Sequence, residues 1–74
     1  MPTAKLLEDL ASKYNETPIS VGKHGILDGV ATVIYANLEN GSYTVIEIDK
    51  TIGCVLSIGT DFKFKLPVKK TAKL

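Results

Sequence analysis

The stretch from residue 30 to residue 59 constrains the fold most, because it is typical of a β-meander whose strands are apolar on both faces. Its three apolar runs cover residues 30–36, 43–48 and 54–58. A strand with one solvated face alternates apolar and polar residues, and these runs mostly do not. We therefore expect each face of the sheet to be covered by something.

An amphipathic helix is predicted over about residues 3–14. Its apolar stripe, at three- and four-residue spacing, consists of Leu6, Leu7, Leu10, Ala11 and Tyr14. Thr3 is the expected N-cap, and Pro18 prevents the helix from continuing. Such a short helix is unstable alone, so we expect its stripe to pack on the sheet.

Turn signals divide the rest of the chain. Residues 19–21 are predicted to form a lead-in or edge strand, and Asn40-Gly41 a type I′ hairpin turn, since both residues accept positive φ. Residues 62–66 alternate between apolar residues and lysine, which predicts a last edge strand with lysines outward. The meander is thus expected over about residues 19–66.

The predicted architecture is one α+β domain over residues 1–74, with an N-terminal helix packed on an antiparallel meander of four or five strands. The face away from the helix is expected to pair with a second copy in a homodimer, or to close internally if the sheet forms a small barrel. The candidate interface residues, or their alternating neighbours because the register is open, are Val33, Tyr35, Tyr43, Val45, Val55 and Ser57.

Composition supports association. The chain is 45% hydrophobic, which is generous for 74 residues and leaves apolar surface to be exposed or buried by a partner. No stretch approaches the roughly 20 apolar residues of a membrane span, and the N-terminus lacks the apolar core of a secretory leader. The single cysteine, Cys54, excludes an intrachain disulfide and is expected to be buried and inert. A cytoplasmic location is the expectation.

Charge separates along the chain. Residues 1–62 hold four lysines and eight acids, and residues 63–74 hold five lysines and no acid, so charges of −4 and +5 give the net +1. In the basic strand and the tail over residues 67–74, a lysine series with one aromatic ring could follow a nucleic-acid backbone. The candidate contacts are Lys63, Phe64, Lys65, Lys69 and Lys70. The absence of arginine favours the simpler interpretation, an edge strand guarded by lysines and a solvated terminus.

No catalytic, cofactor or metal site is predicted. His24 is the only histidine and is expected in a solvated loop, where one imidazole cannot form a zinc site alone. The aspartates at predicted turns are expected to cap backbone groups, and Glu47 to pair with a lysine across the sheet. The sequence therefore predicts a small non-enzymatic interaction or accessory protein, with weak nucleic-acid binding as the alternative.

An ordered set of segments resembles a family of small uncharacterised proteins of proteobacteria and their phages. The segments are residues 10–22, 35–36, 40–45 and 54–59. Those proteins read as a helix ending in Tyr-Gly-Glu, a Ser-x-Gly step, a Thr-Gly-Thr-Trp-Thr hairpin and a Pro-Asp-Gly turn before Ser-Cys. This chain departs from them at Tyr43, which replaces the tryptophan, and at residues 49–53, which replace the Pro-Asp-Gly turn. The resemblance implies a helix-plus-meander domain and a phage or marine bacterial source, and it implies no activity.

Overall fold

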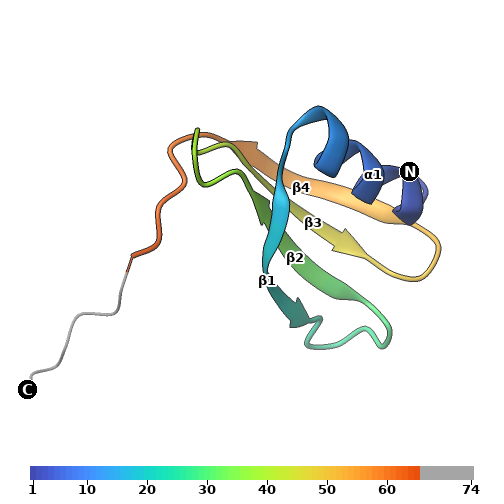
Figure 1. Cartoon of the computed structure of the whole chain (residues 1–74). Helices are drawn as coiled ribbons and strands as arrows, with labels where there is room; N and C mark the ends of the chain where they lie inside the picture. Colours follow the sequence, from blue (N-terminus) through green and yellow to red (C-terminus); the bar gives the residue numbers. More distant parts are fainter. Residues whose placement is uncertain (66–74) are drawn as a thin grey trace, which may run out of the picture.

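A computed structural model describes residues 1–65 and shows one helix followed by an antiparallel four-stranded sheet (Figure 1). The elements are α1 (Thr3–Lys13), β1 (Thr17–Lys23), β2 (Ala31–Ala36), β3 (Tyr43–Ile48) and β4 (Gly53–Gly59). The strands lie in chain order, β1-β2-β3-β4, so each pairs with its neighbour in sequence. The predicted α+β meander with an N-terminal helix is confirmed.

The two faces of the sheet differ in burial. Val33 pairs with Ile46 and Tyr35 pairs with Thr44 across β2 and β3, and all four side chains are buried on the face toward α1. Their sequence neighbours point to the opposite face, where the side chains other than that of Ala36 are only partly buried. The side chains therefore alternate in burial even though the sequence alternates little in hydrophobicity.

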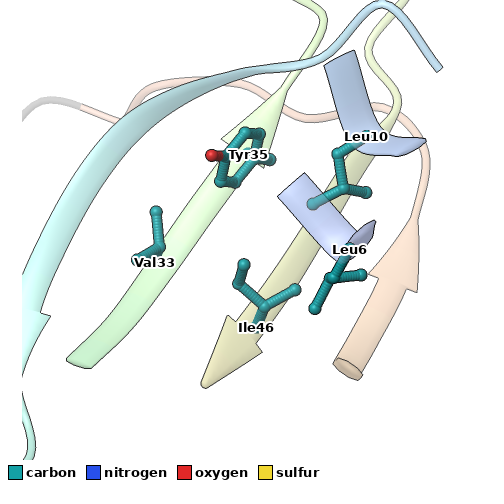
Figure 2. Close-up of a cluster of buried hydrophobic side chains, with 5 residues drawn as sticks. All are labelled: Leu6, Leu10, Val33, Tyr35 and Ile46. Carbon is teal, nitrogen blue, oxygen red and sulfur yellow. The ribbon is translucent and has the colours of Figure 1, made fainter. Parts of the chain in front are cut away.

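The core lies between α1 and the central strands. Figure 2 shows Leu6 and Leu10 of α1 beside Ile46 of β3, with Val33 and Tyr35 of β2 next to them. Ile46 has no exposed surface. Burial raises the pKa of the Tyr35 hydroxyl above its ordinary value.

Two members of the predicted helical stripe lie outside this core. Ala11 is exposed and Tyr14 is 57% exposed, because α1 ends at Lys13 and Tyr14 occupies the C-cap. Asn15 then takes a positive φ of 53°, a conformation that asparagine tolerates at helix ends.

The start of α1 is fixed by the β3–β4 turn. Thr3 is not the N-cap as predicted; Pro2 occupies that position and makes no side-chain cap bond. The Thr3 hydroxyl instead donates to the Asp49 carbonyl oxygen at 2.9 Å, and the Thr3 N–H donates to the Thr51 carbonyl oxygen at 2.9 Å. These long-range bonds join the first turn of the helix to the sheet.

The hairpin between β2 and β3 is longer than the predicted two-residue turn. Gly41 has φ +82° but Asn40 does not have a positive φ, so the type I′ prediction is wrong. The Asn37 side-chain oxygen accepts hydrogen bonds from the backbone N–H groups of Glu39 and Asn40 at 2.8 and 3.2 Å. Asn37 thus organises a wider loop by an Asx-type contact.

Residues 62–65 do not form the predicted edge strand. Asp61 takes φ +60°, and the Phe62 N–H donates to the Gly41 carbonyl oxygen at 2.9 Å, which turns the chain across the β2–β3 loop. The Phe62 ring lies 5.6 Å from that of Tyr43, and Phe64 meets Phe62 edge-on at 5.5 Å. The predicted inward position of Leu66 and the basic tail lie outside the described residues.

Candidate interaction surface

Strand β4 forms one edge of the sheet and carries no charged residue. All side chains from residue 54 to residue 58 are exposed, with Val55 at 50%, Leu56 at 55% and Ile58 at 72%. Natural edge strands are usually protected by charged side chains, proline or a cover, because an open edge is a template for pairing. β4 has neither charge nor proline over its length.

The other edge strand, β1, is protected in the usual ways. It contains Pro18 and ends in Lys23. A register shift is common to both edges, since β1 shifts against β2 between Pro18 and Ser20 and β4 shifts against β3 between Val55 and Ser57. Val21 is 71% exposed, so β1 is as open to solvent as β4 but chemically less suited to pairing.

The backbone of β4 points hydrogen-bonding groups outward. The Gly53 N–H donates to the Met1 carbonyl oxygen at 2.7 Å, and the Met1 amino group donates to the Gly53 carbonyl oxygen at 3.0 Å. Backbone groups alternate in direction along an antiparallel strand, so those of Val55 also point outward. Within residues 1–65, no backbone hydrogen bond from another segment reaches the outer edge of β4 beyond Gly53.

An apolar groove runs between α1 and β4, which lie along one another in Figure 1. Its cavity volume is about 480 Å³. The apolar and aromatic residues that line this α1–β4 groove are Met1, Leu6, Leu10, Tyr14, Tyr43, Val55 and Ile58. Since Val55 and Ile58 belong to both features, the groove and the open edge form one continuous surface.

One end of the α1–β4 groove is polar. Glu16 is only 2% exposed, and its carboxylate Oε1 accepts a hydrogen bond from the Thr44 hydroxyl at 2.8 Å. The Ser42 hydroxyl oxygen lines the same end and is buried with no hydrogen-bond partner within residues 1–65. The Glu16 N–H donates to the Leu10 carbonyl oxygen at 3.0 Å, which holds this residue against the end of α1.

Glu16 has no ion-pair partner in the described part of the chain. The ion pairs there are Lys5–Asp9 and Lys13–Asp9, and the remaining acid–base contact joins His24 and Glu47. Sequence reasoning missed this residue, because a glutamate between a helix and a strand is ordinarily solvated. The positive φ of Asn15, which reverses the chain toward the sheet, is the structural reason for its burial.

The six predicted interface residues do not share one surface. Val33 and Tyr35 are buried under α1, and the register places Tyr43, Val45 and Ser57 on the opposite face. Of the six, Tyr43 and Val55 line the α1–β4 groove. The alternating neighbours that the prediction left open include the exposed Leu56 and Ile58, whereas the exposed Met1 and Tyr14 were not among its candidates.

The basic candidates fall in two groups. Lys63, Phe64 and Lys65 are exposed, with Phe64 at 63%. Lys69 and Lys70 lie outside the described residues. The structure therefore brings together one exposed ring and two flanking lysines.

Cys54 is exposed rather than buried, which corrects the prediction. Its apolar neighbours in sequence indicated a core strand, but β4 is an edge, and Cys54 pairs with Glu47 on the face away from α1. Residues 1–65 contain no group of three metal-ligating side chains.

His24 is half-buried and structural in its contacts. Its Nδ1 atom accepts hydrogen bonds from the N–H groups of Ile26 and Leu27, both at 3.0 Å, so the neutral ring carries its proton on Nε2. Nε2 lies 3.7 Å from a Glu47 carboxylate oxygen, so Glu47 faces this histidine and not the lysine that was expected. The imidazole thus organises the loop after β1.

Asp49 caps the β3–β4 turn, as expected for an aspartate at a turn. Its Oδ1 atom accepts hydrogen bonds from the backbone N–H groups of Thr51 and Ile52, both at 2.7 Å. Both hydrogen bonds, of which the one from Ile52 has the larger effect, lower the pKa of the Asp49 carboxyl below its ordinary value.

The chain matches no protein-family model and has no significant match among curated proteins or solved structures. The resemblance noted from the sequence stays a prediction. Within residues 1–65, no helix has the length and apolar character needed to cross a bilayer.

Proposed function

We propose that this chain is a non-enzymatic interaction protein that works as a homodimer, in which β4 of one copy pairs antiparallel with β4 of the other. One observation carries the proposal: β4 is an exposed, uncharged edge strand with outward backbone groups beside an apolar groove. A symmetric pair would extend the four-stranded sheet across a twofold axis. The exposed apolar side chains of β4 and α1 would then lie on the same side of the joint sheet.

The chemistry of β4 favours a second copy as its partner. Like charges directly opposite each other on neighbouring strands destabilise a pair, and β4 brings none to its own symmetry mate. A self-pairing through β1 would place Pro18 at the new ladder, where it lacks an N–H donor.

An edge interface fits the burial better than a face-to-face interface. On the face away from α1, Thr32 lies opposite Glu47, and the central apolar side chains Ile34 and Val45 are already half-buried. The strongly exposed apolar side chains of the sheet lie instead on the edge strands, and those of β4 adjoin the α1–β4 groove.

The molar mass in solution tests this proposal directly. We expect light scattering to give twice the 8.0 kDa chain mass at high micromolar concentration and to approach 8.0 kDa on dilution. The mass should change little with salt, because β4 contributes no charge. A mass of 8.0 kDa at every concentration would contradict the homodimer.

Weak nucleic-acid binding is a second candidate function. Phe64 is exposed between two exposed lysines and ends a ladder of three rings with Phe62 and Tyr43. Such a ring can stack on a base while lysines contact phosphates. Binding of a single-stranded oligonucleotide that weakens steeply with salt would support this function, and a flat salt response would exclude it.

The exposed, unpaired Cys54 supports a reducing location such as the cytoplasm, because an exposed thiol persists best there. The resemblance to proteobacterial and phage proteins supports a phage or marine bacterial source.

A further inference from the structure

The buried carboxylate of Glu16 lies in the α1–β4 groove, and pairing between two β4 strands would not involve it. It lies at the end of the groove formed by Ser42 and Thr44, and it is 2% exposed. Asp9 also lines the groove, but it already pairs with Lys5 and Lys13, and the Met1 amino group donates to the Gly53 carbonyl oxygen. Glu16 is therefore the lining carboxylate that has no ion-pair partner within residues 1–65.

A buried carboxylate is costly unless a cation or several donors compensate it. An ionised carboxylate offers about four acceptor positions. Within residues 1–65, the Glu16 carboxylate accepts one hydrogen bond, from the Thr44 hydroxyl at 2.8 Å, and no ion pair there includes Glu16. Ser42 lines the same groove, and its buried hydroxyl has no hydrogen-bond partner within residues 1–65, so a second polar group of the lining is unsatisfied.

We propose that the α1–β4 groove binds a linear apolar molecule that ends in a primary amine. The ammonium group would lie against the Glu16 carboxylate and donate a further hydrogen bond to the Ser42 hydroxyl oxygen, since an ammonium group has three donors and no acceptor. The hydrocarbon chain would lie along Leu10, Val55 and Ile58. A volume of about 480 Å³ falls within the size range of small-molecule sites.

This site is distinct from the proposed dimer contact in its chemistry. Dimer formation depends on the uncharged edge of β4, and amine binding depends on one buried charge near the C-terminal end of α1. The two proposals therefore fail in different experiments: the first in the molar mass, the second in a ligand titration at one fixed protein concentration.

The test is an NMR titration of the ¹⁵N-labelled chain with n-octylamine, n-octanol and octanoate, which share an eight-carbon skeleton and differ in the polar end. We expect octylamine to bind at least about tenfold more tightly than octanol, because its charged head meets a desolvated carboxylate. Octanoate should bind most weakly. The shifted amide signals should be those of residues 10, 16, 42, 44, 55 and 58.

The Glu16→Gln variant isolates the charge, because glutamine keeps an oxygen that accepts from Thr44. We expect this variant to bind octylamine and octanol equally, with the octanol affinity unchanged. Glu8→Gln is the matched control, since Glu8 is an exposed acid of α1, and it should keep the preference for the amine. Equal affinity for the two probes in the unmodified chain, or a preference that survives Glu16→Gln, would overturn the proposal.

Discussion

Replacing Ile46 with alanine is expected to lower the free energy of unfolding by about 3–4 kcal/mol. Ile46 has no exposed surface and lies at the centre of the cluster formed with Leu6, Val33 and Tyr35 (Figure 2). The lost side-chain atoms would leave a cavity between α1 and the sheet. A domain of this length has a total stability of about 4–11 kcal/mol, so the variant would be close to unfolding at room temperature.

Urea denaturation at one fixed protein concentration measures this effect. Ile46→Val should cost about 1 kcal/mol, because it removes a single methyl group. The matched control is Ile34→Ala, a half-buried isoleucine of β2 on the face away from α1, and its loss should be clearly smaller. Equal losses for Ile46→Ala and Ile34→Ala would mean that the core does not lie under α1.

Replacing Ile58 with lysine is expected to weaken the homodimer at least about a hundredfold, since it would place a charged ammonium group in the apolar contact between the joined edges. Ile58 is 72% exposed on β4 and lines the α1–β4 groove. Because the side chain is so exposed, the fold itself should tolerate the lysine, and thermal unfolding of the dilute variant checks this. Sedimentation of the variant across a dilution series then gives the change in Kd.

Val21→Lys is the matched control for the other edge of the sheet. Val21 is 71% exposed on β1, so the two substitutions add the same charge at nearly the same exposure. The proposed dimer should be unaffected by Val21→Lys. A loss of mass that is equal in both variants, or a dimer that survives Ile58→Lys, would rule out pairing along β4.

The helix and the strands could be predicted from the sequence where a single local residue pattern determines the secondary structure. Leu6 and Leu10 recur at a four-residue spacing, and both are buried as expected for an amphipathic helix. Runs of β-branched residues set β2, β3 and β4, and their order in the sheet follows from the short connections.

Two sequence-based predictions were wrong because a side chain forms a contact that the local sequence pattern does not indicate. Asn40-Gly41 is a standard dipeptide for a two-residue hairpin turn. The Asn37 side-chain oxygen, however, accepts hydrogen bonds from two backbone N–H groups of the same loop, and the loop is wider. Residues 62–65 alternate like a strand, yet the positive φ of Asp61 and the tilted contact between the Phe62 and Tyr43 rings turn them away from the sheet. Local patterns carry no information about such competing contacts.

The interaction surface was the hardest part to predict, because it depends on which strand lies at the edge. Cys54 and Val55 have the same apolar character as residues of a central strand, and their exposure follows only from the position of β4 in the sheet. Glu16 is buried through the turn at Asn15, which brings a residue from outside the helix into the groove. Neither fact has a signature in hydrophobic periodicity.

Hydrogen exchange of the Val55 amide across a protein dilution series tests the central claim most directly. The Val55 N–H points away from β3, as does that of Gly53, so pairing along β4 would give it a hydrogen-bond partner in the second copy. We expect its protection to rise with protein concentration, together with the molar mass, while the Val21 amide of β1 stays unchanged. A dimer that forms without added protection at Val55 would contradict the account.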